Sequence, residues 1–322
     1  MITNDLEVTV AARGAAATEP DLAIRVRGLR KSYDGAVQAL DGVDLDVRRG
    51  EVLAVLGPNG AGKTTLVEIL EGHRSADTGE VSVLGHDPAA RERAFRARIG
   101  IVLQEDGIDS SLTVREAVEL YSAAYPHPRP AAEVLDLVGL GDRPDVRIAA
   151  LSGGQRRRLD LALGIAGDPE LVFLDEPTTG FDPSARRQSW ELISALRDLG
   201  KTILLTTHYM DEAQHLADRV VVIARGNVIA DGTPDTLGRS AGEAARVSFR
   251  VPYGVADGEL PLPDAADVER RERHVAFRTH TPTRDLAPLL TWAAESDIEL
   301  EALTVTRPTL EDVYLQLTEE PA

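Results

Sequence analysis

Leu56-Gly57-Pro58-Asn59-Gly60-Ala61-Gly62-Lys63-Thr64-Thr65-Leu66 is the stretch of sequence that decides the fold. Before it, residues 51–56 form a short apolar run bounded by turn residues, which predicts a buried strand of a parallel sheet. After it, Leu66, Ile69 and Leu70 recur at helical spacing. A G-x-x-x-x-G-K-S/T sequence between a strand and a helix indicates a phosphate-binding loop.

The residue types in this loop suit phosphate. Glycine has no Cβ, so the backbone at Gly57, Gly60 and Gly62 can curl tightly and aim N–H groups at phosphate oxygens. The following helix adds the positive end of its dipole. We expect Lys63 to reach the β- and γ-phosphates and the Thr64 hydroxyl to bind Mg²⁺. An ordinary glycine-rich turn is the alternative, but the flanking strand and helix favour a nucleotide site.

Composition limits the kinds of protein that this chain can be. Of its 322 residues, 43% are hydrophobic and 27% charged, as in a soluble globular protein with a substantial core. We expect no membrane span, because no run of 18 apolar residues occurs, and no secretory signal. Cysteine is absent, which excludes disulfides and thiolate metal sites. The net charge of −18 argues against nucleic acid as a partner and against adsorption to anionic lipid.

Short apolar strands alternate with helical segments up to about residue 236. Strands are predicted at 24–26, 43–47, 51–56, 81–84, 99–103, 171–174, 203–205, 220–224 and 228–230. Helices are predicted at 64–71, 88–98, 113–121, 130–138 and 152–165. This alternation indicates a doubly wound α/β domain with a mostly parallel sheet and an antiparallel edge near its start. A helical subdomain is expected at about 105–165.

The composition changes after residue 237. Residues 242–322 hold 16 acidic against 8 basic residues, and 252–267 has the composition of a loop. Strands at 245–251, 274–279 and 298–306, with helices at 283–294 and 309–317, predict a small α+β appendage. We therefore divide the chain into a flexible tail (1–20), a nucleotide-binding domain (21–237) and a C-terminal accessory domain (238–322).

Polar side chains at the ends of predicted strands supply further parts of a nucleotide site. Asp175 and Glu176 follow the strand at 171–174, so they lie at the same edge of the sheet as the phosphate loop. Asp175 is the candidate Mg²⁺ ligand, through water, and Glu176 the candidate base for the attacking water. His208 can donate a hydrogen bond to the γ-phosphate, and Gln104 also ends a strand. Either residue, taken alone, is equally an ordinary polar side chain.

A second anion site is predicted at Leu151-Ser152-Gly153-Gly154-Gln155. Ser152 is a good helix N-cap, and the two glycines leave N–H groups open at a helix start. The phosphate loop already encloses one side of a nucleotide and lies about ninety residues away. We therefore expect this second site to close over a nucleotide held by another copy of the protein. A capped helix after a flexible turn is the alternative.

These residues together resemble the ATP-binding subunit of ABC transporters, over residues 24–234. The family's motifs occur in family order: Walker A at 57–65, the Q-loop glutamine Gln104, the signature at 151–155, Walker B at 171–175 followed by Glu176, the D-loop at 180–182, and the switch histidine His208. Tyr33 falls where family members stack an aromatic ring on adenine. Two departures are small: Phe181 replaces the usual leucine of the D-loop, and three arginines (156–158) follow the signature.

The resemblance implies ATP and Mg²⁺ as ligands and assigns the site residues. The nucleotide-binding residues are Tyr33, Gly57, Pro58, Asn59, Gly60, Ala61, Gly62, Lys63, Thr64, Thr65, Ser152, Gly153, Gly154, Gln155 and Asp182. The Mg²⁺ ligands are Thr64, Gln104 and Asp175. The catalytic residues are Glu176, His208 and Gln104.

The resemblance also implies partners and a location. Two copies are expected to close head-to-tail over two ATP molecules, with hydrolysis reopening them. A separate integral-membrane permease, contacted near Glu105–Leu112, would hold the subunit at the cytoplasmic face of the plasma membrane without direct insertion. Residues 308–315, with 317–318 and with 208–213, are similar to drug- and antibiotic-exporting members of the daunorubicin-resistance type. An amphipathic terminal helix is the alternative interpretation of 308–318.

An exporter ATPase is thus the leading interpretation, and an importer ATPase is its nearest alternative. Related ATPase heads also serve DNA repair, chromosome organisation and translation. Only 47 residues separate Gln104 from Ser152, too few for the coiled-coil insertion of repair-type heads. Translation factors carry two phosphate loops per chain, and this chain has one. The transported compound is not readable here, because its binding site would lie on the permease.

Overall fold

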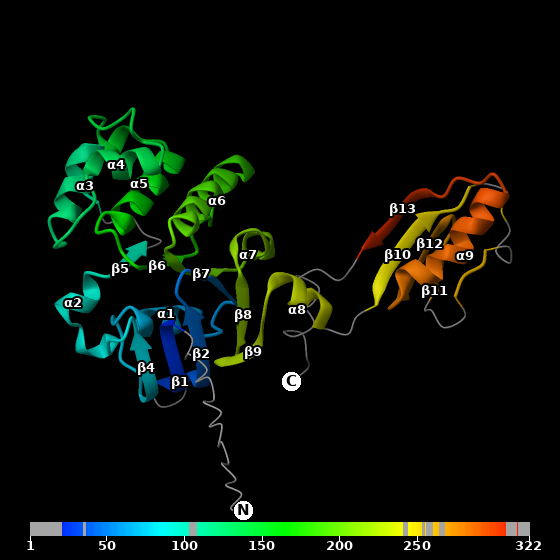
Figure 1. The fold of residues 1–322 in the computed structure, drawn as a ribbon, viewed down its shortest axis with the longest axis horizontal. Helices are drawn as coiled ribbons and strands as arrows, with labels where there is room; N and C mark the ends of the chain where they lie inside the picture. Colours follow the sequence, from blue (N-terminus) through cyan, green and yellow to red (C-terminus); the bar gives the residue numbers. More distant parts are fainter. Residues whose placement is uncertain are drawn as a thin grey trace, which may run out of the picture.

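The computed structural model describes residues 21–34, 37–102, 108–240, 244–252, 255, 260–263, 268–306 and 314. Its strands form three sheets, with the orders β2-β1-β4, β5-β6-β7-β3-β8-β9 and β11-β12-β10-β13 (Figure 1). The predicted tail at 1–20 lies outside the described residues, as do Gln104 and most of 308–318.

The elements have the following bounds. The strands are β1 (Leu22–Tyr33), β2 (Val37–Arg48), β3 (Val52–Leu56), β4 (Thr78–Val83), β5 (Ile99–Val102), β6 (Leu171–Asp175), β7 (Thr202–Thr207), β8 (Arg219–Ala224), β9 (Asn227–Gly232), β10 (Ala245–Arg250), β11 (Val268–Arg271), β12 (His274–Thr279) and β13 (Glu301–Thr306). The α-helices are α1 (Lys63–Leu70), α2 (Arg93–Arg96), α3 (Val114–Ser122), α4 (Ala131–Leu137), α5 (Gly153–Ile165), α6 (Pro183–Asp198), α7 (Met210–Leu216), α8 (Pro234–Ser240) and α9 (Pro282–Glu295). Two short 3₁₀-helices are η1 (Pro88–Ala90) and η2 (Ile148–Ala150).

The central sheet is built around β3, as the apolar run at 51–56 predicts. Strands β7 and β8 pair with β3 in parallel, and β9 closes the edge as the antiparallel half of a hairpin. Every residue of β3 is buried. Val52, Ala54 and Leu56 pack into one core and Leu53 and Val55 into another, so both faces of the strand are covered. A parallel strand covered on both faces needs this continuous apolar sequence.

The antiparallel edge forms a sheet of its own. In β2, the buried residues Val43, Leu45 and Val47 alternate with Asp44 and Asp46, as predicted for a half-exposed strand. Its apolar side shares a core with α1 and with the second face of β3. This packing places the phosphate loop between the two sheets.

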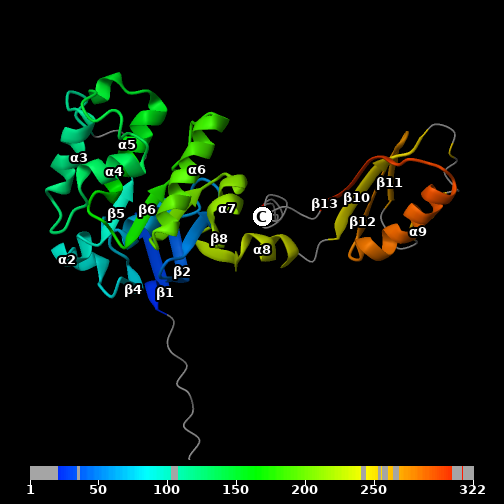
Figure 2. The ribbon, with the colours of Figure 1, turned by 45° about the horizontal axis from the view of Figure 1, so that its top comes forward.

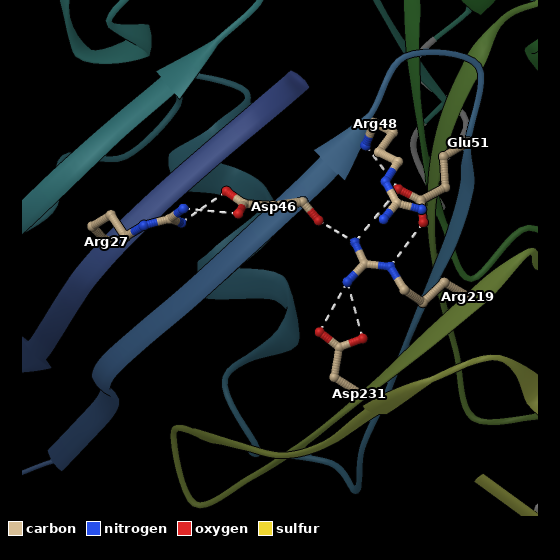
Figure 3. Close-up of polar contacts among 6 residues, drawn as sticks. All are labelled: Arg27, Asp46, Arg48, Glu51, Arg219 and Asp231. Carbon is tan, nitrogen blue, oxygen red and sulfur yellow. Dashed lines mark hydrogen bonds and ion pairs between the residues drawn. The ribbon is translucent and has the colours of Figure 1, made fainter. Parts of the chain in front are cut away.

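Arg219 of β8 connects the two sheets by polar contacts (Figure 3). Its Nε lies 2.8 Å from Glu51 Oε1, and its Nη1 donates to both carboxylate oxygens of Asp231 at 2.9 Å. Its Nη2 donates to the main-chain carbonyl of Asp46 in β2. Glu51 Oε2 in turn accepts the N–H of Arg48 at 2.7 Å.

Helices α3, α4 and α5 make up the predicted helical region. Thr113 and Glu116 form the predicted capping box at the start of α3. The predicted helix at 88–98 is instead the short pair η1 and α2, because an αL residue, Arg91, separates them. Helices α6, α7 and α8 are not among the predicted helices.

The C-terminal elements form a four-stranded antiparallel sheet with α9 against one face. Figures 1 and 2 show this sheet and helix apart from the other described elements. The strands at 245–250, 274–279 and 301–306 and the helix at 282–295 match the predictions closely. Strand β11 was not predicted. Of the predicted helix at 309–317 the structure describes Tyr314 alone. This residue packs against the core that contains Val52, Ala54 and Leu56 of β3, and not against the core between the C-terminal sheet and α9.

Candidate active site

The phosphate loop lies between β3 and α1. Two of its glycines leave no room for a side chain: a Cβ on Gly57 would lie 2.3 Å from the Ile223 carbonyl oxygen. A Cβ on Gly62, which has a φ of +106°, would lie 2.3 Å from the Ala39 carbonyl oxygen. Glycine is therefore required here both for its conformation and for close approach to β8 and β2.

Lys63, the first residue of α1, is 6% exposed and turns back onto the loop. Its Nζ donates to the Gly57 carbonyl at 2.7 Å and to the Pro58 carbonyl at 3.2 Å. Burial lowers the pKa of Lys63, while the nearby carboxylates of Glu176 and Asp175 act in the opposite direction. The ammonium is thus held in the loop, with carboxylates close by and little water around it.

Asp175 and Glu176 stand at the carboxyl end of β6, beside Thr206 of β7. The Thr206 hydroxyl donates to Asp175 Oδ1 at 2.5 Å, and its oxygen accepts the N–H of Glu176 at 3.1 Å. Glu176 has a φ of +45°, a left-handed conformation that is rare for a residue with a side chain. Strain of this kind is retained where the surroundings fix it, and functional sites are the usual place.

The Glu176 carboxylate is held at both oxygens. Thr179 Oγ1 donates to Glu176 Oε2 at 3.0 Å, and His208 Nδ1 lies 3.3 Å from Glu176 Oε1. The structure therefore brings together Asp175, Glu176 and His208 from two neighbouring strand ends. Thr206 and Thr179 are not among the predicted site residues. Nothing local in the sequence marks Thr206, because its contact with Asp175 depends on the pairing of β7 with β6.

The oxygen groups near the loop fit a magnesium ion. Mg²⁺ is commonly held by one or two protein side chains, substrate phosphates and water. Thr64 is an exposed residue in the first turn of α1, and Asp175 offers a carboxylate at the same edge of the sheet. Gln104, the third predicted ligand, lies outside the described residues.

The signature stretch begins α5 as a capped helix. Ser152 accepts the N–H of Gln155 at 3.3 Å, and Gln155 Oε1 accepts the N–H of Ser152 at 3.0 Å. A Cβ on Gly153 or Gly154 would meet no atom within 4 Å, so this helix start is open on its outer side.

A cavity of about 420 Å³ joins the start of α5 to Glu176 within one chain. It is lined by Leu151, Gly153, Arg156, Arg157, Asp160, Glu176, Thr179 and Phe181. Arg157 Nε donates to the Pro177 carbonyl at 3.1 Å, which ties α5 to the chain just after Glu176. One of the three arginines that depart from the family pattern, Arg157, therefore joins α5 to the segment after Glu176.

The two remaining predicted site residues occupy element ends. Tyr33 ends β1, and its hydroxyl lies 3.1 Å from Thr65 Oγ1 in α1. Asp182 caps α6 by accepting the N–H groups of Ser184 and Ala185 at 2.8 and 2.9 Å.

Sequence comparisons find close relatives along nearly the whole chain. The ABC transporter family profile matches residues 40–179, and an ABC transporter-like C-terminal domain profile matches residues 245–309. The chain is 39% identical to the daunorubicin/doxorubicin resistance ATP-binding protein of Streptomyces peucetius, over 95% of each chain. It is 37% identical to the Nod factor export ATP-binding protein I of Rhizobium meliloti, over 97% of this chain and 92% of the relative.

Solved structures agree with these relatives. The ATP-binding subunit of an ABC transporter matches with a TM-score of 0.61 and 28% identity, over 68% of this chain and 93% of that chain. A dimeric ATP-binding cassette in a post-hydrolysis state, bound to ADP and phosphate, matches with a TM-score of 0.58 and 25% identity. That match covers 65% of this chain and 98% of the cassette.

Proposed function

The chain belongs to the ABC transporter ATP-binding family, and from this we infer that it binds and hydrolyses ATP to power an exporter. Members of this family bind ATP and work as dimers with a membrane permease. One observation carries the inference: a complete phosphate loop and a fixed carboxylate pair occur in a chain whose full-length relatives are named for drug resistance and Nod factor export. Those names favour export over import.

Within the site, Lys63 and the loop N–H groups would hold the phosphates. The Lys63 ammonium now donates to two carbonyls of its own loop, and phosphate oxygens would replace them as charged acceptors. Hydrogen bonds between charged partners are shorter and stronger than neutral ones, so the Lys63 ammonium should prefer the phosphates of a nucleotide to the two carbonyls of its own loop. Residues 57–65 therefore act as the phosphate cradle, with Tyr33 beside them for the base.

Glu176 is proposed as the general base. Its carboxylate, oriented by Thr179 and His208, would accept a proton from the water that attacks the γ-phosphate. Mg²⁺, held by Thr64, Asp175 and Gln104, would offset the negative charge of the phosphates. His208 would sense the γ-phosphate next to Glu176, with Gln104 as a further catalytic residue.

We propose that a second copy completes the site. A Cβ on Gly153 or Gly154 would meet no atom within 4 Å, so the surface at the start of α5 has room for an approaching partner, which supports the use of the N–H groups at this helix start on the partner's γ-phosphate. Ser152 and Gln155 would shape that helix start, and Asp182 would meet the partner near the nucleotide.

The permease contact is proposed near Glu105–Leu112. A cleft of about 500 Å³ lies beside β5, which leads into this segment. It is lined by Glu71, Gly72, His73, Arg91, Arg96, Ile99, Ile101, Tyr121, Tyr125 and Leu163.

No helix among the described residues is long and apolar enough to cross a bilayer. We propose that the permease holds the chain at the cytoplasmic face of the plasma membrane, and that residues 238–322 form an accessory domain.

Replacing Lys63 by alanine tests the assignment. The change removes the buried cation from the loop and should weaken ATP–Mg²⁺ binding by about a hundredfold or more, since bonds to charged groups are the strong ones. Hydrolysis should be lost as well. Lys201→Ala, which removes a lysine bound to Asp168 on the surface, is the matched control. Near-normal ATP affinity of Lys63→Ala in a calorimetric titration would contradict the assignment.

A further inference from the structure

The ring of Tyr33 is held from two directions. Its hydroxyl lies 3.1 Å from Thr65 Oγ1, and the guanidinium carbon of Arg74 lies 5.0 Å from the ring centroid. A guanidinium at this distance over an aromatic face is within the range of a cation–π contact. The hydroxyl contact joins the Tyr33 ring to α1, and Arg74 covers one of the two faces of the ring.

Arg74 is itself fixed by α1. Its Nε donates to Glu68 Oε2 at 2.6 Å. Thr65 and Glu68 are three residues apart on α1, so they share one side of that helix. The ring and the guanidinium are therefore both anchored to the helix that begins with Lys63. The phosphate loop and this pair of side chains therefore lie on the same helix, which supports a place for the base of a bound nucleotide beside Tyr33.

We propose that Arg74 is a positioning residue for the nucleotide base: it backs the Tyr33 ring so that the purine stacks on the opposite face. This inference rests on the proposed ATP site and adds a residue outside its known motifs. A planar ring offers only two stacking faces, and the guanidinium occupies one. Without it, the ring at the end of β1 keeps its hydroxyl contact with Thr65 but loses the cover on one face, so the base has to order the ring further.

The alternative geometry makes an opposite prediction. If the base needs the face that Arg74 now covers, the arginine competes with ATP and its removal should tighten binding. The sign of the change in affinity therefore decides between backing and competition.

The experiment measures binding of two probes, ATP–Mg²⁺ and inorganic tripolyphosphate–Mg²⁺, by calorimetry. Arg74→Ala should weaken ATP about two- to fivefold, the range of an exposed cation–π contact, and leave tripolyphosphate unchanged because it has no base. In the Tyr33→Ala background, Arg74→Ala should have no further effect, since the two residues act through one contact. Arg93→Ala, an exposed arginine of α2, is the control for loss of charge. Glu68→Gln, which loosens Arg74 without removing it, should weaken ATP by a smaller factor.

Three outcomes would overturn the proposal. Tighter ATP binding by Arg74→Ala would show competition for the base. An equal loss for tripolyphosphate would show that Arg74 acts on the phosphates by charge. A loss that persists in the Tyr33→Ala background would show that Tyr33 is not the intermediary. Failure of the unsubstituted protein to bind either probe would instead contradict the ATP site itself.

Discussion

Glu71 is an acid kept largely uncharged inside the protein. It follows α1, is 6% exposed, and lines the cleft next to β5. Burial, with the carboxylates of Asp175 and Glu68 nearby, raises the pKa of Glu71 from 4.5 to about 8. Its Oε2 lies 3.2 Å from His73 Nδ1. A charge on this carboxyl group is therefore costly in the folded chain and costs little in the unfolded chain.

This shift predicts a pH dependence of stability. Between pH 4.5 and about 8 the folded state keeps a proton that the unfolded state has lost. The free energy of unfolding should therefore fall as pH rises, by at most about 1.4 kcal/mol per pH unit from this group, and level off above pH 8. Glu71→Gln should remove this slope, while Glu80→Gln, an exposed carboxylate, should not. Urea unfolding at pH 6, 7, 8 and 9 measures the difference, and parallel curves for all three proteins would disprove this role of Glu71.

The residues that the sequence predicted are those with local signals. Lys63, Asp175 and Glu176 could be recognised because each stands directly beside a buried strand or in a glycine-rich loop. Thr206 and Arg74 could not be recognised in this way, because their partners are about 30 to 40 residues away along the chain. Thr206 meets Asp175 only where β7 pairs with β6, and Arg74 meets Tyr33 only where the end of β1 lies beside α1. Contacts between distant elements leave no periodicity in a single sequence.

At the scale of elements, Arg219 is a polar link between the antiparallel sheet and the central sheet (Figure 3). Its side chain is 21% exposed and that of Glu51 is 8% exposed. Removing one partner of a mostly buried pair leaves the other charge without compensation, which is the costly case. The sheet interface should therefore depend more on this arginine than on any single exposed ion pair.

Arg219→Met should lower the free energy of unfolding by about 3 kcal/mol, because the mostly buried Glu51 then loses its charged partner and, among the described residues, retains the Arg48 N–H as a donor. Arg115→Met, which breaks an exposed pair with Asp145, should cost under about 1 kcal/mol. Urea unfolding of both variants gives the comparison. Equal losses would mean that the Arg219 contacts contribute no more than a surface pair.

The strength of the local sequence pattern also explains why some helices and strands could be predicted and others could not. The run at 51–56 and the capping box at Thr113 are decided within a few residues, and both formed as expected. Strand β11 is Val-Glu-Arg-Arg, without alternation, and it exists by pairing with β12. Helix α6 is not among the predicted helices although its start has local signals, because Asp182 caps it and Pro183 is its first residue.

At the scale of the whole molecule, the two halves of a catalytic site belong to different copies in our proposal. One chain supplies the loop, Asp175 and Glu176; the other supplies the open start of α5. If Glu176 is the base, Glu176→Gln keeps the shape but cannot accept the water's proton, a role worth about 10² to 10⁴ in rate. The contacts of Lys63, Thr64 and Asp175 with nucleotide should survive.

The Glu176→Gln protein should therefore bind ATP, hydrolyse it very slowly, and remain as a dimer in ATP–Mg²⁺ but not in ADP. Light scattering of the eluted protein measures the mass in each nucleotide. Adding Ser152→Arg should break the dimer, because a long cationic side chain would replace a small cap at the shared site. Ser296→Arg, exposed at the end of α9, should leave it intact. A Glu176→Gln protein that stays monomeric in ATP at high concentration would mean that α5 needs the permease to meet its partner, or serves no partner's nucleotide.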